Sequence, residues 1–166
     1  TGPQNTALGD AALDTYTTGG YNVAVGRSAL HNNTTANYNV GMGFGALATN
    51  TTGVSNVGIG TYALTSSTTS DANTAVGNAS LQSNTTGAGN TGMGASALLL
   101  NTTGGGQTAC GYQSLHSATT GTNNSGLGVN AAQWSIETVE ELRKHTDRPI
   151  IIRQHSSRSY TEHKTD

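Results

Sequence analysis

This 166-residue sequence is poor in both residue classes that build most globular domains. Hydrophobic residues make up 33% of the chain and charged residues 10%, against about 45–50% and about 25% in typical domains. The net charge of −2 gives no electrostatic reason to bind nucleic acid or an anionic membrane. A single cysteine, Cys110, excludes an internal disulfide, and no apolar run approaches the roughly 18 residues of a membrane span.

Glycine, asparagine, threonine, serine and alanine replace the missing classes, a composition that by itself is compatible with disorder. A strict internal repeat over residues 5–133 argues against disorder. Each unit has 17 residues and follows the pattern N-[TV]-[AG]-Φ-G-x-x-[AS]-L-x-x-x-T-T-G-x-x, where Φ is apolar. Gln107 opens one unit, and asparagine opens the others, at Asn5, Asn22, Asn39, Asn56, Asn73, Asn90 and Asn124.

Three further positions repeat with the same period, counted from the opening residue of each unit. Position five is glycine in every unit: Gly9, Gly26, Gly43, Gly60, Gly77, Gly94, Gly111 and Gly128. Position nine is leucine until Ala132 in the last unit: Leu13, Leu30, Leu47, Leu64, Leu81, Leu98 and Leu115. Position four is Φ: Leu8, Val25, Met42, Ile59, Val76, Met93, Cys110 and Leu127.

The length and composition of the unit favour short strands over helices. Helical-hairpin repeats need more than about 30 residues, and glycine, asparagine and threonine are weak helix formers. We expect a strand at positions two to four, a turn at the glycine, a second short strand from the [AS]-L step, and a T-T-G turn. Stacked units then form an all-β parallel β-solenoid, or β-roll, of about eight coils over residues 1–133.

Stacking places identical residues above one another, about 4.8 Å apart. We therefore predict two internal apolar columns, of position-nine leucines and of Φ side chains, and an inward asparagine ladder whose amides bond along the stack. One coil of this kind buries little apolar surface, so we expect several chains to associate. The small residues at position three would suit a close contact between chains: Ala7, Ala24, Gly41, Gly58, Ala75, Gly92, Ala109 and Gly126.

The units NTALGDAAL, NVAVGRSAL and NVGIGTYAL resemble the head repeat of YadA-like trimeric autotransporter adhesins. They also resemble the NTTG-linked repeat of tail-fibre-like phage proteins and of some bacterial surface proteins. The resemblance covers about 129 of the 166 residues and implies a left-handed β-roll, a homotrimer, and a role as spacer or adhesive surface. YadA-like heads usually have shorter units, and this chain shows no stalk heptads or membrane anchor, so the phage-fibre group is the closer match.

The last 33 residues differ in composition from the repeat. They carry twelve charged residues, whereas the first 133 carry four. Ser135 can cap a helix over about 136–145, and residues 149–153 (PIIIR) are typical of a strand. We expect residues 134–166 to form a charged cap or tail of short α/β structure that covers the open end of the stack.

No arrangement of residues indicates catalysis or a bound metal or cofactor. His31 and His116 share position ten but lie five units apart, about 24 Å in a stack, too far to share an ion within one chain. Cys110 replaces an apolar Φ residue and is expected to be a small hydrophobic residue, not a nucleophile. The Asn-x-Thr sequons at Asn33, Asn50, Asn84 and Asn101 are expected to be turn residues.

These observations predict a structural protein and not an enzyme. The first hypothesis is a trimeric section of a phage tail fibre or virion appendage involved in host attachment, with other fibre proteins and a cell-surface glycan or protein receptor as partners. The alternative is a bacterial trimeric surface adhesin head, and a third is a carbohydrate- or ice-binding β-solenoid. Adjacent threonines point to opposite faces of a strand, which disfavours ice binding. All three hypotheses place the chain on a virion, at the cell surface or in the extracellular space.

Overall fold

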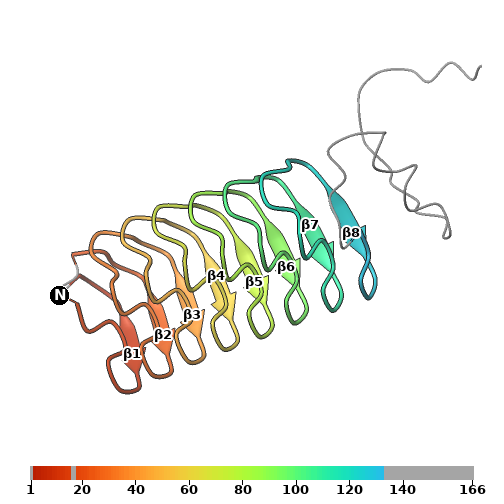
Figure 1. The fold of residues 1–166 in the computed structure, drawn as a ribbon. Coiled ribbons are helices and arrows are strands. Elements are labelled where there is room, and N and C mark those ends of the chain that lie inside the picture. Colours follow the sequence, from red (N-terminus) through yellow and green to blue (C-terminus); the bar gives the residue numbers. More distant parts are fainter. Residues whose placement is uncertain (1, 16–17, 133–166) are drawn as a thin grey trace, which may run out of the picture.

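The computed structural model describes residues 2–15 and 18–132. They form one parallel sheet of eight short strands in sequence order, with each strand beside the next (Figure 1). The chain between strands loops away from the sheet and returns, so the molecule is a stack of similar coils. The strands are β1 (Thr6–Leu8), β2 (Val23–Val25), β3 (Val40–Met42), β4 (Val57–Ile59), β5 (Thr74–Val76), β6 (Thr91–Met93), β7 (Thr108–Cys110) and β8 (Ser125–Leu127).

The register between coils is the 17-residue period itself. Thr6 pairs with Val23, and Val23 pairs with Val40; every later pair of strands keeps the same offset. Backbone bonds continue the ladder at both ends of each strand, as between Val40 N–H and Asn56 O (2.8 Å) and between Gly43 N–H and Val25 O (2.8 Å). The predicted all-β parallel solenoid of 17-residue coils is confirmed, and we number the coils 1 to 8 from their opening residues, Asn5 to Asn124.

Each coil contains one strand, whereas the sequence predicted two. The [AS]-L step lies in a turn, and the position-nine leucines have φ between 48° and 53°. A left-handed conformation costs a non-glycine residue roughly 1–2 kcal/mol. The leucine nevertheless keeps a bond to the next coil, as from Leu30 N–H to Ala46 O (3.0 Å), and its side chain is directed into the interior. Burying a leucine contributes about 1.5–3 kcal/mol, which offsets the conformational cost.

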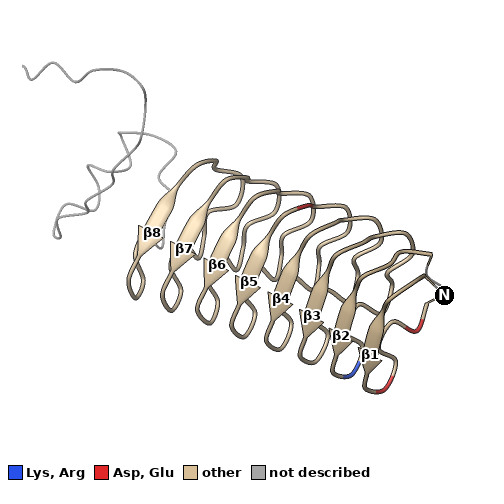
Figure 2. Cartoon of the chain, turned by 180° about the vertical axis from the view of Figure 1, so that it is seen from behind, with Lys and Arg blue, Asp and Glu red and all other residues tan. Residues whose placement is uncertain are grey.

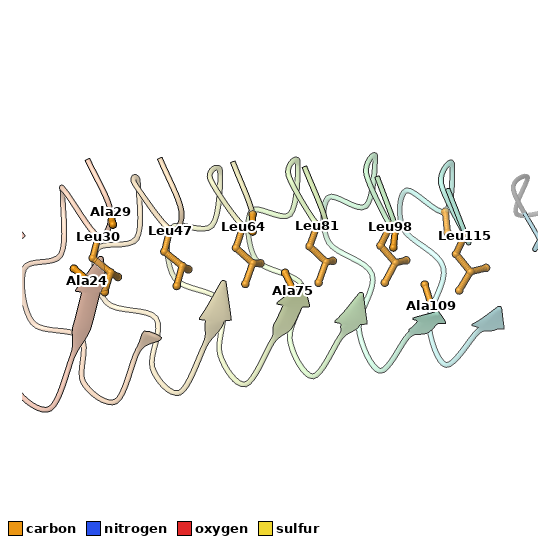
Figure 3. Close-up of a cluster of buried hydrophobic side chains, with 13 residues drawn as sticks. Ala24, Ala29, Leu30, Leu47, Leu64, Ala75, Leu81, Leu98, Ala109 and Leu115 are labelled. Carbon is orange, nitrogen blue, oxygen red and sulfur yellow. The ribbon is translucent and has the colours of Figure 1, made fainter. Parts of the chain in front are cut away.

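The position-nine leucines form the apolar core of the stack. Figure 3 shows them in a single row, each side chain directed from the turn toward the strands. Alanines at positions three and eight pack around them, including Ala24, Ala29, Ala75 and Ala109. The relative exposure is 2% at Leu115 and 0% at Leu30, Leu47, Leu64, Leu81 and Leu98, while Leu13 in coil 1 is partly buried against the cluster.

The Φ side chains at position four do not form a second internal column, which corrects the core predicted for them. Val25, Val76 and Cys110 are half-buried. The remaining five are exposed: Leu8 (67%), Met42 (40%), Ile59 (38%), Met93 (47%) and Leu127 (84%). Successive residues of a strand face opposite sides, so only one side of a three-residue strand can face inward. Position three takes that place, and positions two and four lie on the outside.

The small residues at position three are therefore internal, apart from Ala7 in the first coil, and are not a contact surface between chains. Ala24, Ala75 and Ala109 are fully buried. A Cβ added to Gly41 would lie 3.2 Å from Leu30 Cγ, and one added to Gly58 would lie 3.3 Å from Leu47 Cγ. The leucine of one coil thus fills the space under the strand of the next, and a large residue at position three would not fit beneath it.

The asparagines at position one form the predicted inward ladder. Asn22, Asn39, Asn56, Asn73 and Asn90 are fully buried. The Asn39 Oδ1 accepts the backbone N–H of Asn56 (2.8 Å) and its amide Nδ2 (3.2 Å), and Asn56 Nδ2 also donates to Ser70 O (2.7 Å). Gln107 keeps the backbone bond to Asn90 Oδ1 (2.9 Å), and Asn124 Nδ2 donates to Gln107 Oε1 (3.4 Å). These bonds satisfy polar groups that would otherwise be costly to bury.

Position five requires glycine for two reasons: its backbone conformation, and the close approach of the backbone of the next coil. The φ values of these glycines lie between +116° and +135°, a range that side-chain-bearing residues rarely adopt. A Cβ on Gly94 would also lie 2.5 Å from Gly111 O in the next coil. The predicted charged tail, with its helix over about 136–145 and strand over 149–153, lies outside the described residues.

Candidate functional surface

The outer face of the sheet carries an exposed apolar stripe along the described chain. It carries the Φ side chains at position four, which form an apolar column. The position-two side chains beside them are the half-buried Val23, Val40 and Val57 in three coils and threonine or serine in the other five. The columns run the length of the sheet because every strand repeats the same orientation. At about 4.8 Å per strand, eight strands give a stripe roughly 38 Å long. Soluble monomers rarely expose contiguous apolar patches beyond a few hundred Å².

Aromatic side chains lie in the turns on both sides of the strands. Tyr21 and Tyr38, at position 17, precede β2 and β3, and their rings stack at 5.1 Å with an interplanar angle of 17°. Phe44 follows β3 and meets the Tyr62 ring edge-on at 5.1 Å. The Arg27 guanidinium lies 5.8 Å from the centre of the Phe44 ring. Stacking of the coils thus brings aromatic residues that are 17 or 18 apart in the sequence into contact.

Charge is confined to a few places on the described stack. Asp10 and Asp14 lie in coil 1 and Arg27 in coil 2, near the N-terminal end of the stack, whereas Asp71 lies by itself midway along it (Figure 2). Arg27 Nε lies 3.3 Å from Asp10 Oδ2, with both side chains largely exposed. Exposed pairs of this kind contribute at most about 1 kcal/mol to stability. The greater part of the surface therefore offers neutral polar and apolar groups to a partner.

The two threonines of each T-T pair have different surroundings. The first, at position 13, donates its hydroxyl to the backbone of the next coil, as from Thr51 Oγ1 to Thr68 O (3.0 Å) and from Thr85 Oγ1 to Thr102 O (3.0 Å). The second, at position 14, is exposed, as at Thr52. The T-T pairs thus contribute one column of exposed threonines, at position 14, and not the flat double row expected of an ice-binding surface.

The two histidines and the cysteine among the described residues do not come together. His31 Nδ1 lies 3.2 Å from Ala11 O, and His116 Nδ1 lies 3.2 Å from the Ser117 hydroxyl. Cys110 is half-buried in the outer apolar column. Among residues 2–15 and 18–132, no three His, Cys, Asp or Glu side chains are grouped so that they could hold a metal ion.

A second asparagine column lies inside the stack at position 12 and was missed by sequence reasoning. Asn33, Asn50, Asn84 and Asn101 are fully buried, although the sequence suggested turn residues within glycosylation sequons. Asn101 Nδ2 donates to Asn84 Oδ1 (2.8 Å) and to Gly104 O (3.0 Å). The signal was present in the sequence, because asparagine recurs before the T-T pair in four coils.

Within the part of the chain that the structure describes, no helix is long and apolar enough to cross a membrane. The chain matches no protein-family model, no curated protein and no solved structure in the comparisons made with each.

Proposed function

We propose that this chain is a structural section of a trimeric fibre, in a phage tail fibre or related virion appendage involved in host attachment. The observation that carries the proposal is the exposed apolar stripe on the outer face of the sheet. Leu8, Met42, Ile59, Met93 and Leu127 expose between 38% and 84% of their surface in the single chain. Covering them with the same stripe of other copies removes apolar area from water, at about 25 cal/mol per Å².

The geometry of the stripe favours chains that lie side by side and in register. Every coil presents the same two outward positions, so two stripes can meet along their whole length only if the rods are aligned side by side. Such an assembly is a straight rod whose length is set by the number of coils, which suits a spacer. The number three comes from the resemblance to trimeric fibre and adhesin repeats, as does the left-handed coil.

The test is the mass of the folded chain in solution. A trimer of the 16.8-kDa chain has a mass of about 50 kDa by light scattering or sedimentation equilibrium. We expect Ile59→Asp and Met42→Asp to dissociate it, because each would bury a carboxylate in an apolar contact. Thr52→Asp, on the exposed threonine column away from the sheet, is the matched control and should leave the mass unchanged.

A wild-type chain that is folded by circular dichroism and monomeric at high concentration would refute the proposal. A bacterial trimeric adhesin head would share the same interface, so this measurement does not separate it from a phage fibre. Flanking sequence does: an outer-membrane anchor segment would favour the adhesin, and a virion-attachment segment would favour the fibre.

A further inference from the structure

The stacked tyrosines at position 17 lie in coils 1 and 2 and do not continue into coil 3. Tyr21 and Tyr38 expose 50% and 59% of their surface, and one face of the Tyr38 ring packs on Tyr21. In the next two coils the same position is occupied by Ser55 and Ala72. The Tyr38 ring therefore forms the wall of a step, with short side chains on the other side of it.

The backbone at this step does not change, so only the side chains differ. Tyr38, Ser55 and Ala72 have φ values of 61°, 58° and 56°. Their Cβ atoms consequently leave parallel coils in nearly the same direction. A ring at position 55 would stack on Tyr38 just as Tyr38 stacks on Tyr21, and Ser55 leaves that place open to a ring supplied by another molecule.

The carboxylate of Asp71 lies close to the open place beside Tyr38. Asp71 Oδ1 accepts the backbone N–H of Val54, the residue immediately before Ser55, at 2.7 Å. Asp71 is exposed, and it is the one charged residue between Arg27 and Gln133 (Figure 2). Two coils earlier, the Oδ1 of Asn37 accepts the backbone N–H of Gly20 at the same distance of 2.7 Å. An amide is thus sufficient for the structural bond, and the negative charge of Asp71 is not needed for it.

We propose that Tyr38, Ser55 and Asp71 form a binding ledge for a neutral pyranose of a cell-surface glycan. A pyranose presents a face of C–H groups that packs on the electron-rich face of an aromatic ring. Its hydroxyls lie at the rim, where the Ser55 hydroxyl and the Asp71 carboxylate can bond to them, and a bond to a charged acceptor is stronger than one between neutral groups. The negative charge disfavours acidic sugars. The ledge lies in the turn before the strands and not on the sheet face proposed to join the chains.

The test uses the full chain with the methyl glycosides of glucose, galactose and mannose as probes and glucuronic acid as the acidic comparison. Saturation-transfer NMR and titration of the tyrosine ring resonances should show saturable binding of at least one neutral glycoside and weaker binding of glucuronic acid. Ser55→Tyr fills the ledge with a third stacked ring and should abolish binding while preserving the fold. Asp71→Asn keeps the bond to Val54 and should weaken binding about tenfold or more.

The matched control is Tyr112→Ala, which removes an exposed aromatic (51%) from a turn on the other side of the strands and should leave sugar binding unchanged. Absence of binding for all three neutral glycosides, or undiminished binding by Ser55→Tyr, would overturn the proposal. These results do not depend on the oligomeric state. A monomeric chain that binds a glycoside would refute the trimeric fibre and keep the ledge, and a trimer that binds none would do the reverse.

Discussion

The asparagine column at position 12 is interrupted in coil 4, where Ser67 replaces asparagine. Asn50 Oδ1, in the coil before, is buried and has no hydrogen-bond partner among the described residues. The Ser67 hydroxyl instead pairs with the hydroxyl of Ser70 at 2.6 Å. Ser70 itself stands at position 15, where the neighbouring coils have Gly53 and Gly87. In coil 4, serine thus replaces both the asparagine of position 12 and the glycine of position 15, and the two serines bond to each other inside the stack.

Packing explains why the two positions change together. A Cβ added to Gly53 would lie 2.6 Å from Asn50 Oδ1, and one added to Gly87 would lie 2.5 Å from Asn84 Oδ1. A smaller serine at position 12 makes room for the Ser70 side chain. Coil 2 combines Asn33 with Ala36, and there Asn33 Nδ2 donates to Ala36 O at 3.2 Å, longer than the 2.9 Å of Asn50 to Gly53 O. The crowding is thus relieved by a small shift and not by loss of the bond.

The double substitution S67N/S70G should stabilise the protein. The new amide would donate to Asn50 Oδ1 and satisfy it, and an unsatisfied buried acceptor costs about 1–3 kcal/mol. S70G alone should destabilise by a similar amount, because it leaves the buried Ser67 hydroxyl without its partner. Asn73 Nδ2 and Asn84 Nδ2 would each lose a bond to Ser70 Oγ but keep one to Gly87 O (2.9 Å). S67N alone should be close to neutral, since the satisfied acceptor offsets the crowding against Ser70.

The assay is equilibrium unfolding in urea of the four proteins at one fixed chain concentration, because association would make stability concentration-dependent. The cycle should give a favourable coupling of at least about 2 kcal/mol, in the upper part of the range for residues in contact. A double variant no more stable than wild type, or effects that simply add, would show that the Asn50 acceptor is already satisfied. Hydrogen exchange of the coil 4 amides should become slower in the double variant and faster in S70G.

Two further pairs of substitutions test the core and the turns. Leu64→Ala should lower the free energy of unfolding by about 2–5 kcal/mol, because a column with no other large side chain in its layer cannot close the cavity. Leu100 is 40% exposed, so Leu100→Ala should change the free energy of unfolding by less than about 0.5 kcal/mol in the same urea titration. Equal losses of stability in the two variants would contradict an internal leucine column. Gly94→Ala should lower the melting temperature more than Gly128→Ala. Both glycines have strongly positive φ, so an alanine at either position costs about 1–3 kcal/mol in backbone conformation. Of the two, only Gly94 also has a backbone oxygen 2.5 Å from the added Cβ. Equal melting temperatures of the two variants by calorimetry would exclude that clash.

The repeat determined much of this fold before any tertiary contact was known. A period of 17 residues without insertion requires identical positions to stack, so the leucine row, the asparagine ladder at position one and the strand at positions two to four follow from local pattern and translation. The glycine at position five also follows, because both its conformation and the approach of the next coil demand the absence of a side chain. None of these features depends on how the coil is shaped in cross-section.

The cross-section was decided by tertiary structure. The sequence placed both Leu47 and Met42 in the core, but a coil with one short strand has room for one large side chain in each layer. The leucine fills it from the turn side, so the strand must turn Gly41 inward and Met42 outward. The same packing carried Asn50 from an expected surface turn into the interior. The period of the repeat determines which residues lie above one another. Only the path of the chain within a coil determines which of these residues are exposed to solvent.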